Sequence, residues 1–351
     1  MKDIAVHLIN LSLSELEQFV VSIGEQKFRA KQISEWLWRG APNFSVMKNL
    51  PENLREKLDE IAGIMPVKVV KKIESSDGQT TKFLLELSDG EQIETVLMRT
   101  SYGASVCVSS QAGCAMGCAF CASTLLGLKR NLTATEMISQ VLVCQWELRP
   151  DEVSHIVVMG TGEPLYNCDN LREFLEMAHD KLSIGWRKMT VSTCGIVPGI
   201  IALTEWGRPV NLAISLHAPT DVLRSQIMPI NNKYKIADVM DVATAHADAT
   251  GRQLMIEYIL IADKNDSVAT AQELAALLRD KNAMVNLIPL NPVAERPFVA
   301  PSNNTVHRFA DTLKSSGVHT RIRRERGADI GSACGQLRNS REGGNPLHPN
   351  E

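Results

Sequence analysis

The sequence has few aromatic residues, no excess of charge of either sign and no long hydrophobic run. Phe, Trp and Tyr make up 5% of 351 residues, and 37 basic against 40 acidic side chains give a net charge of −3. This balance excludes a protein whose whole surface attracts polyanions, so a nucleic acid would have to bind at local patches. The apolar runs fall short of the ~18 residues of a membrane-spanning helix, and the first residues do not resemble a signal peptide. We therefore expect a cytoplasmic protein without membrane contact.

Cysteine is also sparse for a chain of this length, with 8 residues. In a reducing cytosol these thiols should be free, so metal binding or catalysis explains them better than disulfide scaffolding. The 44% hydrophobic and 22% charged residues are ordinary for a folded protein and exclude disordered and collagen-like chains. The length suits two domains, or one barrel-sized domain with an attachment.

Residues 1–90 are predicted to form a small helical accessory domain that runs into the start of a hairpin. A capping box at residues 12–15 begins one helix, a second is expected over residues 28–39, and Pro51 suits the first turn of a third. Basic side chains in this domain either contact RNA phosphates or form a solvated helix face. They are Lys27, Arg29, Lys31, Arg39, Arg55 and Lys57.

Residues 91–337 are predicted to form an α/β domain, and the polar residues 338–351 a flexible tail. After a hairpin over residues 81–96, β-branched runs predict strands over residues 105–110, 155–159, 188–193, 210–216, 253–261, 284–290 and 318–323. Helices are expected between them, over residues 133–146, 170–179, 236–249, 267–279 and 305–315. This alternation gives parallel strands in an open sheet or in a partial or complete barrel, with the chemistry at their C-terminal ends.

Three cysteines in a glycine-containing segment follow the first predicted barrel strand. Cys114, Cys118 and Cys121 are separated by three and then two residues, so their thiols can converge on one small site. Structural zinc and ferredoxin-type clusters need four protein ligands, so three cysteines leave one metal position open. The other interpretations are three buried thiols, or a zinc site completed by a distant residue such as Cys107 or Cys334.

This spacing, with Phe120 before the last cysteine, resembles the signature of radical S-adenosylmethionine (SAM) enzymes. The resemblance implies one [4Fe–4S] cluster with three cysteine ligands, whose open iron binds the amino and carboxylate groups of SAM. Gly162 and Glu163, after the next strand, suit close backbone approach and an ammonium group. Later strand ends supply further candidate cofactor-binding residues, each of which could instead be structural. They are Ser192, Ser215, Leu216, His217 and Asn291.

Several segments together resemble the RlmN and Cfr family of RNA methyltransferases over nearly the whole chain. They are Cys107, the cysteine triplet, and residues 162–164, 215–217 and 333–337. The resemblance implies a partial (β/α)6-type TIM barrel with a catalytic cysteine loop near the C-terminus. It assigns Cys334 to carry a methyl group as S-methylcysteine, Cys107 to release a covalent protein–RNA adduct by forming a disulfide, and Glu94 to accept a proton.

The resemblance also implies substrates and partners. Pro164 after Glu163 resembles RlmN, which modifies adenine C2, whereas Cfr modifies C8 and usually has alanine there. The implied substrates are an adenosine in the peptidyl transferase region of 23S rRNA and one next to the tRNA anticodon, with two SAM molecules used per turnover. A flavodoxin with its reductase would donate electrons, and the protein is expected to be a monomer. The alternatives are a Cfr-type C8 methyltransferase, another radical enzyme and a zinc-stabilised RNA-binding protein without catalysis.

Four arginines precede the Cys334 segment: Arg321, Arg323, Arg324 and Arg326. An unperturbed thiol is mostly protonated at neutral pH, so methyl transfer to a cysteine needs a favourable local field. The arginines could supply that field, contact RNA phosphate or only form a solvated face, and we favour RNA contact.

Overall fold

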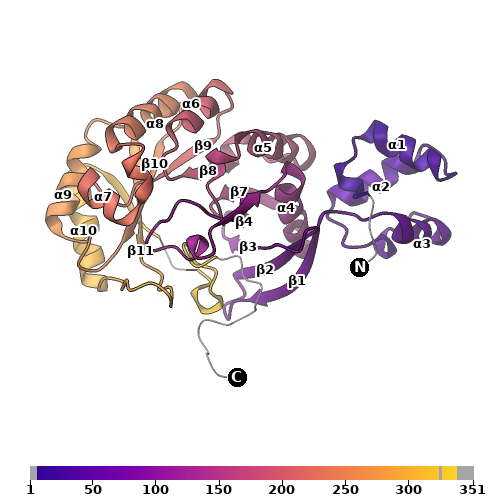
Figure 1. Ribbon diagram of the computed structural model, residues 1–351, viewed down its shortest axis with the longest axis horizontal. Helices are drawn as coiled ribbons and strands as arrows, with labels where there is room; N and C mark the ends of the chain where they lie inside the picture. The colour runs from indigo at the N-terminus through magenta and orange to yellow at the C-terminus, as the bar shows by residue number, and fades with distance from the viewer. Residues whose placement is uncertain (1–5, 324–325, 338–351) are drawn as a thin grey trace.

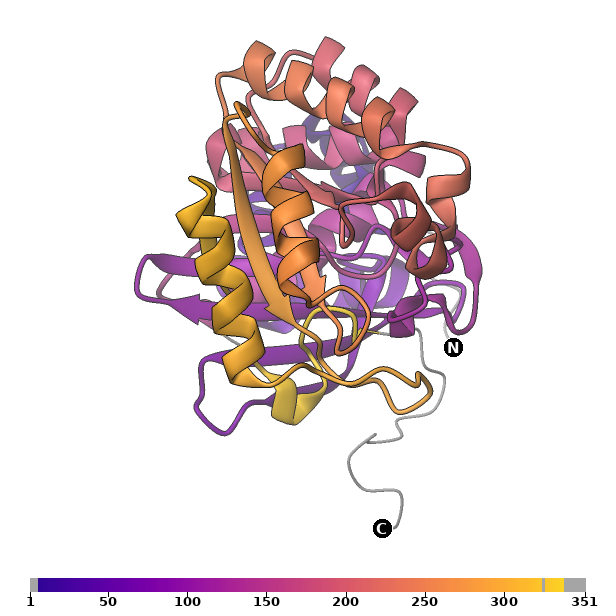
Figure 2. The same cartoon turned by 90° about the vertical axis from the view of Figure 1, so that its left-hand side faces the viewer.

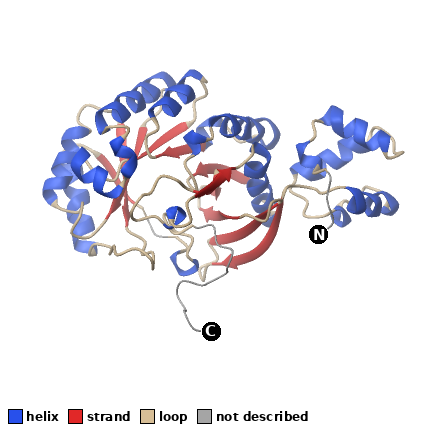
Figure 3. Cartoon of the chain, viewed as in Figure 1, coloured by secondary structure: helices blue, strands red, loops and turns tan. Residues whose placement is uncertain are grey.

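A ten-stranded sheet wrapped by helices forms the centre of the molecule in the computed structural model, which describes residues 6–323 and 326–337 (Figures 1 and 3). The strands lie in the order β1-β2-β3-β4-β7-β8-β9-β10-β11-β12, and β5 pairs with β6 in a separate ribbon. From β4 to β12 neighbouring strands are parallel, whereas β1 to β4 are antiparallel. The strands are β1 (Val67–Glu74), β2 (Thr80–Leu87), β3 (Gln92–Thr100), β4 (Gly103–Cys107), β5 (Gln111–Gly113), β6 (Leu128–Asn131), β7 (Val153–Val158), β8 (Met189–Thr193), β9 (Asn211–Ser215), β10 (Leu254–Leu260), β11 (Ala283–Pro289) and β12 (His319–Ile322).

Helices alternate with the parallel strands and cover the outside of the curved sheet (Figures 2 and 3). These barrel helices are α4 (Ala134–Leu148), α5 (Cys168–Leu182), α6 (Val197–Glu205), α7 (Asp221–Ile227), α8 (Ile236–Thr250), α9 (Val268–Leu277) and α10 (Asn303–Ser315), and three helices precede the sheet in the chain: α1 (Leu13–Ser22), α2 (Arg29–Trp38) and α3 (Glu52–Ile61). β1 and β12 are the outer edges of the described sheet, so the barrel is open. The predicted partial (β/α)6 barrel is therefore confirmed, with β12 as a last parallel strand. Within the described ranges, no helix has the length and apolar character needed to cross a membrane.

The central parallel strand β9 is apolar on both faces, because helices cover one face of the sheet and the barrel interior lies on the other. Leu212, Ala213 and Ile214 are consecutive in β9 and all buried. Such uninterrupted apolar runs are typical of strands covered on both sides. Polar site residues therefore gather mainly at the strand ends, and Glu257 in β10 and Asn286 in β11 are polar residues within strands.

The N-terminal helices α1–α3 have their own hydrophobic core and lie to one side of the barrel (Figure 1). The predicted capping box is present, with Ser12 and Glu15 each bonded to the other's backbone N–H. Gly40 joins this unit to the barrel, because a Cβ there would lie 2.1 Å from the carbonyl oxygen of Leu142 in α4. The division predicted after residue 90 falls between the paired strands β2 and β3 and stays a prediction.

Among the described strands and α-helices, five were not predicted from periodicity: β1, the two short ribbon strands β5 and β6, α6 and α7. β1 is an outer edge strand and mostly exposed, so its residues carry charge rather than apolar alternation. α6 begins with Val197-Pro198-Gly199, a combination that is more typical of a turn. Gly199 is required there because a Cβ would lie 2.6 Å from the Leu165 side chain. α7 has 7 residues, too few to give a clear helical period.

Candidate active site

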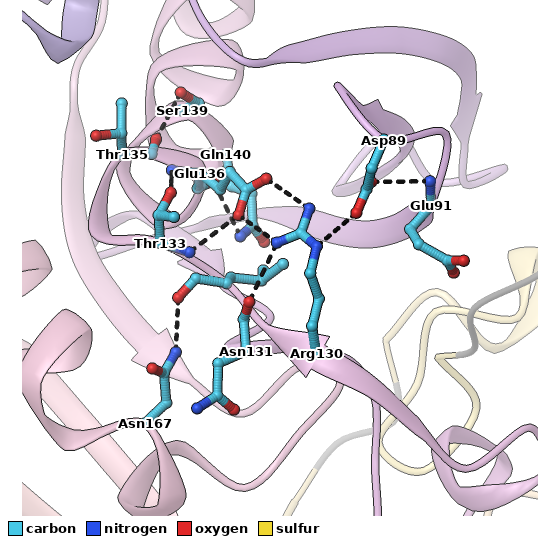
Figure 4. Close-up of polar contacts among 11 residues, drawn as sticks. Asp89, Glu91, Arg130, Asn131, Thr133, Thr135, Glu136, Ser139, Gln140 and Asn167 are labelled. Atoms are coloured by element: carbon cyan, nitrogen blue, oxygen red, sulfur yellow. Dashed lines mark hydrogen bonds and ion pairs between the residues drawn. The ribbon is translucent and has the colours of Figure 1, made fainter.

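A two-stranded ribbon holds the loop that carries the cysteine triplet. β5 ends at Gly113 and β6 begins at Leu128, so residues 114–127 form a loop closed at its base by strand pairing. Arg130 on β6 donates to both carboxylate oxygens of Glu136 in α4, at 2.8 Å each (Figure 4). Its Nε forms an ion pair with Asp89 in the turn after β2. Arg130 therefore fixes the ribbon both to α4 and to the antiparallel part of the sheet.

The three predicted metal ligands, Cys114, Cys118 and Cys121, line one cavity. Burial raises the pKa of Cys114 to about 11, and burial also raises the pKa values of Cys118 and Cys121. The other two thiols raise the pKa of Cys118 further. In the described part of the chain, no three His, Cys, Asp or Glu side chains stand in metal-binding geometry. The three thiols nevertheless fit a cluster. Their thiolates would be buried and would repel one another, and a shared metal centre stabilises such negative charges.

Gly162, Glu163, Ser192, Ser215 and His217, all predicted to bind the cofactor, line the same cavity. Ser192 and Ser215 come from the C-terminal ends of the neighbouring strands β8 and β9, and their hydroxyl oxygens are 3.4 Å apart. The expectation that these strand ends meet is therefore confirmed. Whether their side chains hold SAM remains a prediction.

Glu163 is buried, and hydrogen bonds from two backbone N–H groups occupy part of its carboxylate. The backbone N–H groups of Leu165 and Cys194 donate to it at 3.0 and 2.8 Å. Burial raises the pKa of Glu163, and the hydrogen bonds from Cys194 oppose that shift. Gly162 lies beside it with a φ of 112°, and a Cβ there would lie 2.6 Å from the Gln111 side chain. This glycine is therefore needed for packing, whatever the cavity binds.

His217 is buried in the wall of the cavity and uses one ring nitrogen for a structural hydrogen bond. The backbone N–H of Ile259 donates to Nδ1 at 3.0 Å, so a neutral ring carries its proton on Nε2. The ring stands edge-on to Phe120, with 5.0 Å between centroids. Burial lowers the pKa of His217 to about 3, and the positive charge of Arg224 adds to this effect.

Glu257 on β10 lines the same cavity with one carboxylate oxygen that has no hydrogen-bond partner. Asn286 Nδ2 donates to Oε1 at 2.8 Å, whereas Oε2 is buried and unsatisfied. The Arg323 guanidinium lies 3.8 Å from Oε2. A ligand with a hydroxyl or amino group would supply the missing donor. The cavity therefore fits a polar cofactor of the SAM type beside the three thiols.

The Cys334 loop is attached directly to the cysteine loop. The carbonyl of Gly335 accepts a hydrogen bond from the Ala122 N–H at 2.8 Å. Asn291 Nδ2 donates to the Cys334 carbonyl at 3.1 Å from the end of β11. Cys334 consequently lines the cavity of the three thiols.

A second cavity adjoins the first, and Cys334 and Arg323 line both. Cys107, at the end of β4, lines the second cavity. Burial raises the pKa of Cys107 to about 12; nearby Cys334 adds to the shift and the charge of Arg323 opposes it. The structure thus brings together the two cysteines that the sequence places more than two hundred residues apart.

Glu94 on β3 forms a buried ion pair beside the Cys334 loop. Its Oε1 lies 2.9 Å from Lys82 Nζ, and the two side chains are 7% and 11% exposed. Lys82 Nζ also donates to the carbonyl of Gly331 at 3.1 Å. Glu94 is not among the described residues that line either cavity. Its role as proton acceptor remains a prediction.

Two predicted cofactor-binding residues lie away from the cavity of the three thiols. Leu216 is fully buried and its N–H donates to the carbonyl of Glu257 at 3.1 Å, so its side chain belongs to the core. Asn291 lines the second cavity. Of the four arginines, Arg323 lines both cavities, and Arg326 lines the second cavity and donates to the Arg99 carbonyl at 3.1 Å.

Arg321 is exposed, and Arg324 lies outside the described residues. RNA contact by these arginines remains a prediction.

Sequence analysis missed three charged residues of the site, Lys82, Arg224 and Glu257. Glu257 stands in the apolar stretch Met255–Ile259, where a lone carboxylate within a strand is a detectable signal. Lys82 and Arg224 follow ordinary polar patterns, so periodicity alone assigns them to solvent.

An open (β/α)6 barrel whose first strand end leads to three clustered cysteines defines a radical SAM enzyme. Residues 108–275 match the family model of the radical SAM superfamily, and residues 6–64 match that of the ribosomal RNA large subunit methyltransferase N-terminal domain. A crystal structure of a radical SAM methyltransferase from Sphaerobacter thermophilus is similar, with a TM-score of 0.87 and 41% identity over 95% of this chain and 99% of that one.

Curated relatives give the family. A probable dual-specificity RNA methyltransferase RlmN from Symbiobacterium thermophilum is 48% identical over 95% of this chain and 91% of the relative. One from Bacillus cereus is 49% identical over 94% of this chain and 92% of the relative. The chain therefore belongs to the RlmN family of radical SAM methyltransferases. Membership implies a [4Fe–4S] cluster and SAM, and the donor set described above fits both.

Proposed function

We propose that the protein methylates C2 of an adenosine in 23S rRNA, in the peptidyl transferase region, and of an adenosine next to the tRNA anticodon. The observation that supports this most directly is the position of Cys334. Its thiol lines both the cavity of the cysteine triplet and the cavity of Cys107. A single sulfur can thus carry a one-carbon unit between a radical source and a second thiol.

Cys114, Cys118 and Cys121 would hold the cluster, and Glu163, Ser192 and Ser215 would surround SAM. When bound, the cluster and SAM supply a 5′-deoxyadenosyl radical and a methyl group. Glu257 Oε2 is placed to accept a hydrogen bond from the bound cofactor, because no described residue donates a hydrogen bond to it. Packing of Phe120 against His217 closes part of the cavity to water.

Cys334 would act as the methyl carrier. After hydrogen abstraction, the methylene on its sulfur adds to adenine C2, which is electron-poor and offers no nucleophile for direct methylation. A base would then remove the C2 proton, and the unpaired electron of the adduct would leave to an electron acceptor, for which the cluster held by Cys114, Cys118 and Cys121 is the candidate. The Cys107 thiolate would then attack the Cys334 sulfur. The sulfur–sulfur bond forms as the sulfur–methylene bond breaks, and its electron pair with a proton completes the new methyl group.

Arg323 and Lys82 would support this sequence. Burial opposes ionisation of Cys107, and Arg323 beside it offsets part of that penalty. Lys82 holds Glu94 next to the Cys334 loop, so Glu94 could accept the C2 proton after a small movement. A flavodoxin with its reductase would reduce the disulfide and the cluster.

The target adenine has to leave its stack to reach a barrel mouth, which favours RNA loops over regular duplex. Basic residues of the N-terminal helices could contact RNA phosphates, although Lys27 is paired with Glu17 at 2.9 Å. We further propose that the protein acts as a cytoplasmic monomer.

The identity of the methylated base tests the proposal. The anaerobically reconstituted enzyme is incubated with rRNA, tRNA, reductant and isotope-labelled SAM, and the RNA is digested and separated. We expect labelled 2-methyladenosine, and none with Cys334→Ala. Labelled 8-methyladenosine would show a Cfr-type enzyme instead. Bound zinc without sulfide would contradict the radical mechanism, and full turnover by Cys334→Ala would indicate a different radical reaction.

A further inference from the structure

Arg224 on α7 is fully buried, and its guanidinium is surrounded by neutral oxygen atoms. Nη2 donates to the carbonyls of Cys194 at 2.6 Å and Ser215 at 3.3 Å, and Nε to that of Leu216 at 3.1 Å. Nη1 donates to Asn231 Oδ1 at 3.0 Å. These bonds satisfy the donors of Arg224, but none of the acceptors carries a negative charge.

Among the residues that the structure describes, no carboxylate forms an ion pair with Arg224. Asp221, one helical turn earlier, lies near enough for its charge to raise the pKa of Arg224, but its carboxylate accepts the backbone N–H of Ile236 and forms no ion pair with the guanidinium. A buried cation without a counter-ion is strongly destabilising, so such groups are almost always paired or bound to a ligand. The position of Arg224 therefore suggests that its counter-charge is a bound group.

The nearest candidate for that group is the content of the thiol cavity. α7 contacts the cysteine loop directly, because the Ile227 carbonyl accepts a hydrogen bond from the Ala119 N–H at 2.9 Å. The charge of the guanidinium opposes the burial that raises the pKa values of Cys118, next to Ala119, and of Cys194, so both thiols lie near it. Arg224 thus stands behind the cavity wall, beside one predicted cluster ligand.

A four-iron cluster on three thiolates carries a net negative charge, which increases when the cluster accepts an electron. We propose that Arg224 is the buried counter-ion of this cluster and that its charge favours the reduced state, raising the reduction potential. This inference rests on the proposed cluster ligation by Cys114, Cys118 and Cys121. Arg224 acts through its charge and is a positioning residue, because its donors are bonded to the protein.

The test is a potentiometric titration of the anaerobically reconstituted full chain, followed by the electron paramagnetic resonance signal of the reduced cluster. Arg224→Gln should shift the midpoint potential to more negative values, and Arg224→Lys should shift it less because the charge remains. Arg252→Gln is the matched control, since Arg252 donates to Asn211 at the opposite end of β9. Its potential should equal that of the wild type.

A second variant guards against misfolding of Arg224→Gln. Asn231→Asp keeps the oxygen acceptor 3.0 Å from Nη1 but places a carboxylate on the guanidinium, so it should also make the potential more negative. Wild-type potential in either variant, with a full complement of iron and sulfide, would overturn the inference. A wild-type chain that assembles no four-iron cluster would instead contradict the proposed function.

Discussion

At the residue scale, Lys82 joins two parts of the site through one ammonium group. It pairs with Glu94 and bonds the Gly331 carbonyl in the Cys334 loop. Replacing Lys82 by Met removes the ammonium group from its buried ion pair with Glu94 and should lower the free energy of unfolding by about 3–5 kcal/mol. Turnover should fall by roughly 10²-fold, the scale of one proton-transfer group. Denaturant unfolding and single-turnover methylation measure the two effects.

Lys72 provides the control for Lys82, because it forms an exposed ion pair with Glu147 on the edge strand β1. Lys72→Met should change stability by less than about 1 kcal/mol. Equal effects of the Lys72 and Lys82 substitutions on stability and turnover would show that burial of the Lys82–Glu94 pair is important for neither.

Cys107 is expected to release the protein from its product. In Cys107→Ala no thiol can attack the Cys334 sulfur, so protein should accumulate covalently bound to RNA during turnover. Mass spectrometry of the anaerobic reaction after nuclease digestion should find a nucleotide on the Cys334 peptide. Cys144→Ala serves as control, since that thiol is buried and lines neither cavity. Finding only free protein with Cys107→Ala would contradict the role of Cys107 in product release.

His217 should make stability depend on pH. Its pKa is about 3 in the folded chain and 6.5 in the unfolded chain, so the unfolded chain binds more protons between these values. Its contribution to stability is complete above pH 6.5 and is lost as the pH falls. Acidification from about pH 7.5 to about pH 5 should cost roughly 2 kcal/mol through this group.

The variant His217→Gln isolates this effect, because glutamine keeps a hydrogen-bond acceptor for Ile259 but does not titrate. Urea unfolding of the cluster-free chain at several pH values should show a smaller loss of stability in the variant. Parallel curves for the two proteins would assign the pH dependence to other groups.

At the scale of elements, Arg130 connects the ribbon β5–β6 with α4 and with the turn after β2 (Figure 4). Without this cation the base of the cysteine loop should open more easily. When a chelator is added to the reconstituted protein, iron release from Arg130→Gln should therefore be several-fold faster than from the wild type. Lys129→Gln, an exposed neighbour on the same ribbon, should behave like the wild type. Equal release rates from all three proteins would show that the ribbon is held by its backbone pairing alone.

Prediction from sequence succeeded where one physical pattern dominated an element. The apolar run of β9 and the capping box at residues 12–15 each indicated one local structure, and both are present. α6 was missed because Pro198 and Gly199 suit its first turn but equally suit a loop. The predicted strand-end residues Ser192, Ser215 and His217 meet at one cavity, since parallel strands share a C-terminal edge. The pairing of Lys82 with Glu94 depends on strand register, which periodicity does not specify.

At the scale of the whole molecule, Gly40 sets how the N-terminal helices attach to the barrel. A Cβ at this position would lie 2.1 Å from the Leu142 carbonyl, and φ is 77°. Gly40→Ala should destabilise the interface and expose the connection to limited proteolysis. Gly24→Ala is the control, because φ is 82° there but nothing lies within 4 Å of a Cβ. It should show only the backbone cost of about 1 kcal/mol. Equal protease sensitivity of the two variants would mean that Gly40 is required only for its φ.

The unjoined edges β1 and β12 have a consequence for how a polymer can be processed. A nucleotide inside an RNA chain continues in both directions, so it cannot be threaded end-first into a sealed tube. In the proposed function, the target nucleotide would enter at the mouth of the open barrel, while the flanking backbone stays outside. The incomplete ring thereby suits a strand of any length, and chain ends need not come near the reacting carbon.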